Sequence, residues 1–129
     1  MERLRQRLSL AEMALATLDE VKSLALPAAV ERDVTIMRFI YTFEACWRAL
    51  QRYLNLVEGV DVETPKACMR GARDAGLQSN EQTEAALVMV DDRNLTVHTY
   101  NEQLAKQIVG RMADHVSVMR SLLTAMTSR

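Results

Sequence analysis

Hydrophobic positions recur at helical spacing along most of the chain. In the first segment they lie three or four residues apart, which places them on one face of a helix: Leu4, Leu8, Ala11, Leu15, Leu18, Val21 and Ala25. We expect this helix to end at Pro27, because proline lacks a backbone donor and restricts the residue before it.

A second helix is predicted from about Glu31 to Val57, and Gly59 marks its end. Its predicted inward stripe is Val34, Met37, Tyr41, Glu44, Trp47 with Ala45, Leu50, Leu54 and Val57. Residues 39–47 are apolar on almost every side, which is typical of a central or interface helix. We interpret the aromatic residues there as core. A platform on which nucleic-acid bases stack is the alternative.

Capping signals divide the second half of the chain. Thr64 followed by Pro65 predicts a short helix over about 65–75 that ends at Gly76. Ser79 and Gln82 form a capping box, which predicts a fourth helix from about Asn80 toward Asp92. The last helix is expected from Asn101 or Glu102 to about Thr127, with an inward stripe of Leu104, Ile108, Met112, Val116, Met119, Leu123 and Met126. The pattern predicts an all-α, antiparallel up-down helical bundle of four to five helices, as one domain over residues 1–129.

The composition supports helices and limits the function classes. Four glycines and two prolines in 129 residues fall far below the usual share of about 12%, so an all-β fold would lack its turns. Sixteen basic and seventeen acidic side chains give a net charge of -1. This balance argues against nucleic-acid binding through a strong overall positive field, and leaves only a local basic patch for that role.

The cysteines and hydropathy indicate a compartment. Cys46 and Cys68 are not in a Cys-x-x-Cys pair or near a histidine, so neither zinc nor another metal is expected. Two reduced, buried thiols fit a cytoplasmic protein, and no apolar run is long enough to span a membrane. His115 lies outside the main stripe of the last helix, where a surface or interface position is expected.

Ionisable side chains concentrate in residues 91–101, between the last two predicted helices. On a straight helix, Arg93 and His98 would lie about 140° apart, whereas Arg93 and Tyr100 would share a face. For all three to converge, either the helix breaks between about 94 and 101 or a second copy of the chain contributes. Asn94 and Thr96 are the expected breakers, because their side chains compete for backbone groups.

These residue types suit one reaction in particular. Arginine binds a phosphate or stabilises a developing anion, and histidine transfers protons near neutral pH. Arg93 and His98 would therefore suit metal-independent cleavage of RNA, in which the 2′-hydroxyl attacks the adjacent phosphate. Tyr100 could contact a base or accept a modification. The alternative is structural: the three residues cap a helix, and Asp91 and Asp92 form salt bridges.

The motif resembles that of a known family. Arg93-x4-His98-x-Tyr100 resembles the Arg-x4-6-His motif of the HEPN superfamily, in its extended form ending His-x-Tyr. The longer string from Asp92 to Tyr100 strongly resembles the nucleotidyltransferase substrate-binding family within that superfamily. Residues 38–47, the Thr64-Pro65 start and Ala75-Gly76-Leu77 are similar to that family's second and third helices. The resemblance spans about residues 30–110 in the expected order.

The resemblance implies a helical bundle that forms a homodimer, with the motifs facing each other across the dimer. Family members are encoded beside a small nucleotidyltransferase and bind it. In one interpretation the bundle is a HEPN ribonuclease toxin with RNA as its substrate, and the nucleotidyltransferase antitoxin neutralises it by transferring AMP to the motif tyrosine. In the other it is a non-catalytic substrate-binding or accessory subunit of the nucleotidyltransferase complex.

By motif position, the resemblance implies that Arg93 and His98 are the catalytic pair. Tyr100 would be the modification acceptor or a substrate contact. Three further residues would support the site: Asp92, Asn94 and Thr96. No cofactor and no metal are implied. A third interpretation, a helical interaction protein with no chemistry at these residues, remains beside the other two.

Overall fold

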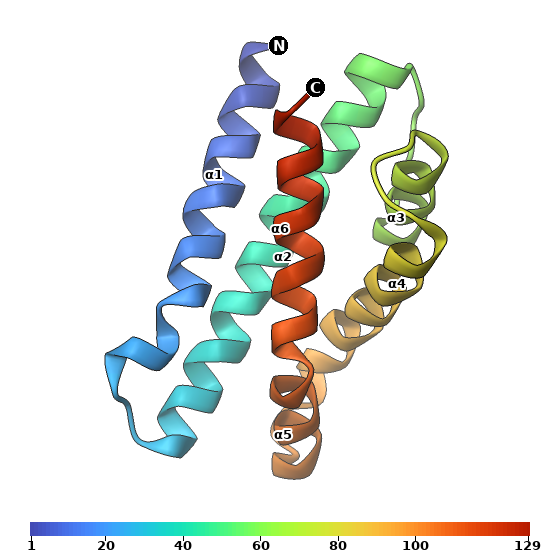
Figure 1. The fold of residues 1–129 in the computed structure, drawn as a ribbon. Coiled ribbons are helices and arrows are strands. Elements are labelled where there is room, and N and C mark those ends of the chain that lie inside the picture. Colours follow the sequence, from blue (N-terminus) through green and yellow to red (C-terminus); the bar gives the residue numbers. More distant parts are fainter.

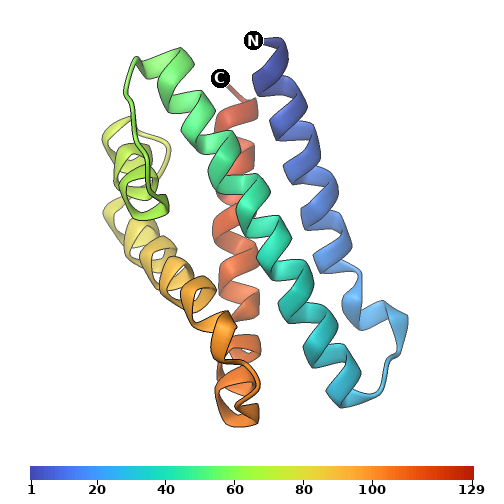
Figure 2. The same ribbon diagram turned by 180° about the vertical axis from the view of Figure 1, so that it is seen from behind.

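The structure is a computed structural model that describes residues 1–129, and all its regular elements are helical. The α-helices are α1 (Glu2–Asp19), α2 (Ala28–Glu58), α3 (Pro65–Asp74), α4 (Asn80–Leu95), α5 (Glu102–Gly110) and α6 (Met112–Thr127). Two short 3-10 helices, η1 (Val21–Leu24) and η2 (Thr96–His98), follow α1 and α4. Helices α1, α2, α4 and α6 alternate in direction, with α3 at one corner and both termini at the same end (Figure 1, Figure 2). The predicted all-α, up-down bundle is confirmed.

Local signals define most helix ends. The Thr64 hydroxyl accepts a hydrogen bond from the Ala67 N–H at 3.2 Å, which caps α3. Ser79 and Gln82 form the predicted capping box of α4, with bonds of 3.0 and 2.7 Å. Gly59 ends α2 at a φ of 67°, a left-handed conformation that glycine adopts without steric cost.

The predicted stripe of the first helix is correct as far as Val21, and every member up to that residue is buried. Beyond it the prediction is wrong, because α1 ends at Asp19 and Ala25 is an exposed residue with a φ of 53°. The chain turns back toward α2 through η1 and this left-handed residue, so no helical face continues to Pro27.

Helix α2 is central, as predicted, and contacts α1, α3, α4, α5 and α6. Its predicted inward stripe is correct for Trp47, Leu50 and Leu54, which are buried, and wrong for three of its other large members. Met37, Tyr41 and Val57 are 56%, 41% and 47% exposed, while the buried face includes Ile36, Phe39, Phe43, Cys46, Trp47, Leu50, Tyr53 and Leu54. A helix that is apolar on most sides carries several competing stripes, so spacing alone does not fix its rotation. Because Phe39, Phe43 and Trp47 are buried, they form core and not a platform for bases.

The predicted last helix is two helices. Helix α5 ends at Gly110 and α6 begins at Met112, with Arg111 between them at a non-helical junction. The inward stripe continues across the break, since Ile108 and Met112 are both buried. The fourth helix also extends past the predicted Asp92, to Leu95.

Both cysteines are free and buried in the core, as predicted. Burial raises the pKa of Cys46 to about 12. It also raises the pKa of Cys68 to about 11, against the opposing charge of Arg48. None of the helices combines the length and the apolar character needed to cross a membrane.

Candidate functional site

The predicted break in the helical path lies at residues 96–101. The Thr96 hydroxyl donates to the Arg93 carbonyl at 2.7 Å, and the Thr99 hydroxyl donates to the Thr96 carbonyl at 2.7 Å. The Asn101 side chain then accepts from the Leu104 N–H at 3.1 Å and caps α5. Polar side chains therefore make this turn without glycine or proline. The exposed side chain of Asn94 takes no part in these bonds.

The motif residues differ in exposure at this turn. His98 is exposed, Tyr100 is 87% exposed, and their rings approach edge-on with centroids 6.2 Å apart. Arg93 is half-buried on the last turn of α4, and no carboxylate pairs with its guanidinium. Its Nε is buried and has no hydrogen-bond partner. The chain thus brings His98 and Tyr100 together, but forms no hydrogen bond from Arg93 to either residue.

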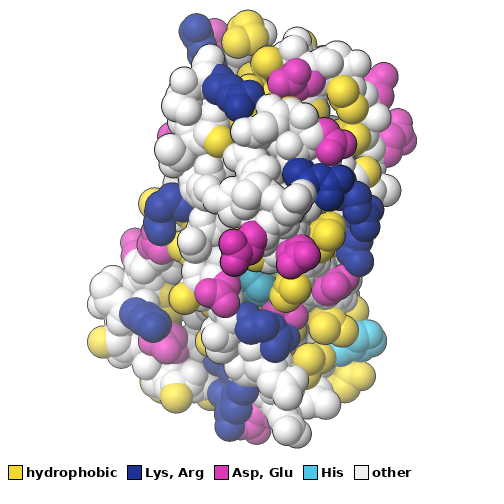
Figure 3. All heavy atoms as spheres, turned by 45° about the vertical axis from the view of Figure 1, so that its right-hand side comes forward, with side chains coloured by type: hydrophobic (Ala, Val, Ile, Leu, Met, Phe, Trp, Pro, Cys, Tyr) yellow, Lys and Arg dark blue, Asp and Glu magenta, His cyan; other side chains and the backbone are white.

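Exposed hydrophobic side chains lie near the motif along the chain. Val88 and Leu95 of α4 and Val97 of η2 are 46%, 38% and 68% exposed. Figure 3 shows yellow hydrophobic side chains gathered beside an exposed histidine at the lower right of the molecule. Apolar side chains grouped around unpartnered polar ones are typical of a surface that binds another molecule.

Asp92, directly before Arg93, lies in the opposite environment. Its side chain is 4% exposed, and both carboxylate oxygens accept bonds from Arg111, each at 2.8 Å. His115 Nε2 donates to the same carboxylate at 2.6 Å, because an ionised carboxylate can only accept. The His115 ring also stacks on Phe39 with centroids 5.3 Å apart. These bonds join α4 to the α5–α6 junction and to α6.

Electrostatics keeps this carboxylate ionised. Burial by itself would raise the pKa of Asp92, but the hydrogen bonds and charges of Arg111 and His115 together outweigh it and lower that pKa. The same contact raises the pKa of Arg111, chiefly through its hydrogen bonds to Asp92. The group is therefore a charged polar link between helices, not a solvated cluster.

The contacts of Asp92 correct the prediction for His115 and decide how the two aspartates, Asp91 and Asp92, are interpreted. His115 was expected at a surface or interface and is instead 1% exposed. Arg111 and His115 are four residues apart, so they share one helical face, and a buried aspartate needs such partners. That spacing was the signal in the sequence for this link. Asp91 also forms a salt bridge, to Lys66 at 2.7 Å, so the salt-bridge interpretation holds for both aspartates.

Three side chains at the turn can take part in chemistry: Arg93, His98 and Tyr100. No three His, Cys, Asp or Glu residues gather closely enough to bind a metal ion together. The exposed imidazole of His98 can exchange protons with a bound molecule, and the Arg93 guanidinium can bind an anion. The exposed hydroxyl of Tyr100 is accessible to a second protein.

Comparisons with known proteins agree with this fold. A family model described as "Nucleotidyltransferase substrate binding protein like" matches residues 6–128. The comparison with curated proteins finds no match. Among solved structures, a Thermus thermophilus protein is 52% identical, with a TM-score of 0.84 over 90% of this chain and 98% of that one.

More distant solved structures share the fold at low identity. One is a tri-AMPylated Shewanella oneidensis HEPN toxin in complex with its MNT antitoxin, 13% identical, with a TM-score of 0.78 over 98% of this chain and 97% of that one. Another, from Haemophilus influenzae, is described as revealing the fold of a substrate binding domain of a nucleotidyltransferase. It is 20% identical, with a TM-score of 0.73 over 93% of this chain and 98% of that one.

Proposed function

The chain belongs to the family of nucleotidyltransferase substrate binding proteins, and we propose that it is the partner subunit of a small nucleotidyltransferase encoded nearby. We further propose that it is a HEPN-type ribonuclease toxin, which the nucleotidyltransferase neutralises by transferring AMP to Tyr100. One observation carries this proposal. At a single helix break, the unpaired guanidinium of Arg93 adjoins a turn that exposes His98 and Tyr100.

In the proposed reaction, the 2′-hydroxyl of RNA attacks the adjacent phosphorus, and the bond to the 5′-oxygen of the next nucleotide breaks. The products are a 2′,3′-cyclic phosphate and a 5′-hydroxyl end. His98 transfers a proton at one of these oxygens, because its imidazole is exposed and free of protein partners. Arg93 stabilises the extra negative charge on the phosphorane oxygens.

A homodimer completes the proposed site. Within one chain Arg93 and His98 form no hydrogen bond with each other, and a second copy across the turn would bring a second guanidinium and imidazole to the same RNA. The exposed side chains of Val88, Leu95 and Val97 supply an apolar surface for that contact. Burial of these three side chains in the dimer would also explain why they are exposed near a polar motif.

Neutralisation acts on the tyrosine in this proposal. The Tyr100 hydroxyl oxygen attacks the α-phosphorus of ATP, pyrophosphate leaves, and the phenolic proton passes to a base of the nucleotidyltransferase. The high exposure of Tyr100 supports this role, because its hydroxyl must enter another protein's active site. The centroids of the Tyr100 and His98 rings are 6.2 Å apart, so the bulky, charged AMP would lie against His98. It would then block the access of RNA to that imidazole.

Expression of the chain alone tests the ribonuclease proposal. We expect growth arrest with RNA degradation, and relief of both by His98→Ala. Gln103→Ala, at an exposed position nearby on α5, is the matched control and should remain toxic. A wild-type chain that is harmless and leaves RNA intact would contradict the ribonuclease proposal.

Mass spectrometry after incubation with the nucleotidyltransferase and ATP tests the acceptor. We expect the mass of AMP to be added to the wild-type chain and absent from Tyr100→Phe. Tyr41→Phe is the control, since Tyr41 is a second exposed tyrosine far along the sequence from the motif. Modification that persists in Tyr100→Phe would exclude Tyr100 as the acceptor.

The non-catalytic accessory subunit is the second candidate, and the balanced charge of the chain favours it. RNA-binding proteins usually carry a basic surface, and a net charge of -1 gives no such general attraction. This function predicts stable co-purification with the nucleotidyltransferase, unchanged in Arg93→Ala, with no RNA cleavage by either protein. Failure of the two proteins to associate at micromolar concentration would count against both candidates.

A further inference from the structure

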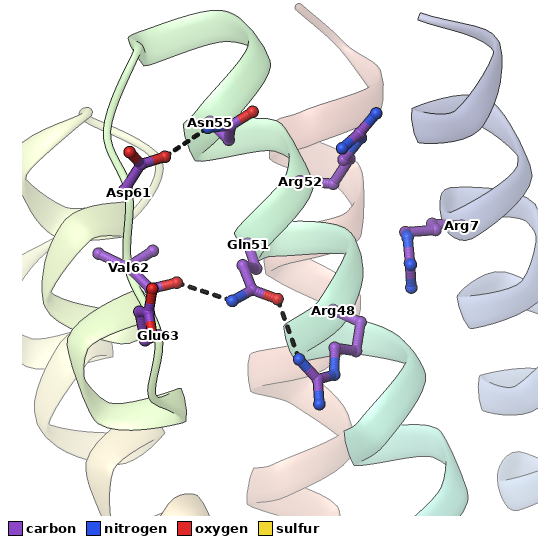
Figure 4. A pocket seen from close by; sticks show the side chains of 8 residues that line it. All are labelled: Arg7, Arg48, Gln51, Arg52, Asn55, Asp61, Val62 and Glu63. Carbon is purple, nitrogen blue, oxygen red and sulfur yellow. Dashed lines mark hydrogen bonds between the residues drawn. The ribbon is translucent and has the colours of Figure 1, made fainter.

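An apolar pocket lies between the end of α1 and the α5–α6 junction. It has a volume of about 540 Å³, and five hydrophobic side chains line it: Leu18, Val109, Met112, Ala113 and Val116. By contrast, the hollow that Figure 4 shows beside α2 is lined almost entirely by polar side chains, with Val62 as its single hydrophobic residue. None of the residues that line the apolar pocket belongs to the motif turn, so the two sites are independent.

The buried part of the apolar pocket is hydrocarbon. Leu18 and Met112 line it and are only 5% and 7% exposed. Thr35 is the one buried polar residue in the lining, and its hydroxyl donates to the Glu31 carbonyl at 2.7 Å. A polar ligand group placed here would lose its water without gaining a free donor, whereas an apolar group would lose nothing.

The charged residues of the apolar pocket are exposed and leave one positive charge without a partner. Asp19 and Arg120 form a salt bridge with each other. Lys22 of η1 forms no salt bridge, and Glu20, two residues before it, pairs with Arg38 at 2.7 Å. The pocket therefore combines a hydrocarbon interior with one unpaired ammonium group at its exposed edge.

Gly110, the last residue of α5, also lines the apolar pocket and has room for a side chain. A Cβ at this position would have no atom within 4 Å, and the φ of Gly110 lies outside the left-handed region. Neither packing nor backbone conformation therefore requires glycine here, although glycine destabilises a helix relative to most residues. The missing side chain leaves this wall of the pocket open.

We propose that the apolar pocket binds a small amphipathic anion: a hydrocarbon chain that carries one carboxylate, as in a medium-chain fatty acid. The chain lies against Leu18 and Met112, where its burial removes apolar surface from water. The carboxylate pairs with Lys22, and one free ammonium group suits a single negative charge. The volume falls in the range of roughly 300–1,000 Å³ that is typical of small-molecule sites.

Calorimetric titration of the purified full chain tests the proposal with three probes, each kept below the concentration at which it forms micelles: decanoate, decylamine and acetate. We expect decanoate to bind as one molecule per chain. Decylamine has a chain of the same length with a positive charge, and acetate has the carboxylate without the chain. Both should bind at least about tenfold more weakly, because each lacks one of the two contacts. Equal binding of decanoate and decylamine, or no binding of decanoate, would overturn the proposal.

Reversing the charge of Lys22 tests the anion preference. Lys22→Glu should weaken decanoate binding about tenfold or more, since it replaces attraction by repulsion, and should bind decylamine more tightly than wild type does. Arg5→Glu makes the same change in net charge at an exposed position about 20 Å along α1 from Leu18, and should bind both probes like wild type. Equal losses of decanoate binding in the two variants would contradict the role of Lys22. So would a Lys22→Glu variant that keeps the Tm of wild type and binds neither probe.

Filling the apolar pocket tests its location. Gly110→Leu/Ala113→Leu adds two side chains to the lining and should weaken decanoate binding at least about tenfold. Gln103→Leu/Gln107→Leu adds leucines at exposed positions of α5 outside the pocket and should bind decanoate like wild type. The filled variant should have a Tm no lower than this control, because leucine favours the helix over glycine and Gly110 has room for it. Wild-type affinity in the filled variant would overturn the assignment of the site.

NMR of methionine methyl groups separates this site from adsorption to other apolar surface. Met112 lines the pocket, whereas Met13 and Met37 lie outside it and are 63% and 56% exposed. Decanoate should shift the Met112 methyl signal, assigned through Met112→Leu, and leave the signals of Met13 and Met37 unchanged. Shifts of the two exposed methionines without a shift of Met112 would mean surface adsorption and would overturn the proposal.

Discussion

Asp92 and Arg93 are neighbours in sequence and opposites in environment. The aspartate side chain is buried and accepts three hydrogen bonds from two residues, Arg111 and His115. The arginine next to it has no salt bridge, and its buried Nε has no partner. The first residue has its hydrogen-bond partners within the chain, whereas the Nε of the second has none there.

The difference separates a structural link from the residues that we propose act on RNA, within a single helical turn. The Asp92 link holds the end of α4 to α6 and so fixes where the turn at residues 96–101 begins. The motif residues beyond it contribute little to that packing, since His98 and Tyr100 are exposed. We therefore expect substitutions in the link to affect stability, and those in the motif to affect function alone.

The largest effect on stability is expected from Asp92→Ala. Removing this carboxylate leaves Nε2 of the buried His115 without a hydrogen-bond partner, whereas the partly exposed Arg111 becomes solvated, so we expect a loss of about 2–3 kcal/mol. Denaturant unfolding measures this loss. Asp91→Ala is the control, because its exposed bridge to Lys66 should contribute at most about 1 kcal/mol. Equal losses in the two variants would contradict a special role for the buried link.

The same carboxylate should produce a distinct acid response. Because the folded-state pKa of Asp92 is lowered, its contribution to stability is present above the unfolded value of about 3.9 and is lost as the pH falls through the folded pKa. Unfolding free energies measured against pH should thus fall more steeply in wild type than in Asp92→Asn over that window. If the unfolding free energies of the two proteins fell in parallel with pH, Asp92 would not be the cause of this pH dependence.

A smaller effect is expected at the turn itself. Thr96→Val keeps the shape of the side chain but removes the 2.7 Å hydrogen bond from its hydroxyl to the Arg93 carbonyl. We expect a loss of about 1 kcal/mol, the usual net contribution of one such bond. Thermal unfolding would measure it. A stability equal to wild type would mean that the backbone forms the turn without this hydroxyl.

The smallest effects on stability are expected in the motif. His98→Ala and Tyr100→Phe remove exposed groups that accept and donate no hydrogen bonds within the chain, so each should change stability by less than about 0.5 kcal/mol. Denaturant unfolding of both variants checks this. A loss above about 1 kcal/mol in either variant would mean that the replaced residue contributes to the stability of the fold.

The sequence predicted features that depend on neighbours along the chain. Thr64, Ser79 and Gly59 set helix ends through contacts within a few residues, so their roles could be predicted without the fold. The helix break was predicted on the condition that Arg93, His98 and Tyr100 converge within one chain, because they do not share one face of a straight helix. That these residues form a functional site remains a prediction.

Features that depend on distant residues were not predictable in this way. The rotation of α2 depends on which neighbours cover each side, so Met37 was expected inside and lies exposed. Arg111, at the break between α5 and α6, and the buried His115 both form hydrogen bonds to Asp92, which lies 19 and 23 residues earlier. Likewise one pocket is lined by Arg7 of α1 and by Arg48 and Arg52 of α2, which are more than forty positions away in sequence.

We propose that the motif turn performs chemistry that the fold does not need. The most direct test is the rate at which the purified chain cleaves RNA, compared between wild type and His98→Ala. We predict cleavage by wild type that leaves 5′-hydroxyl ends, and a loss of about 100-fold or more in the variant, as expected for removal of a general acid or base. Equal rates for the two proteins, or no cleavage by wild type, would contradict the claim.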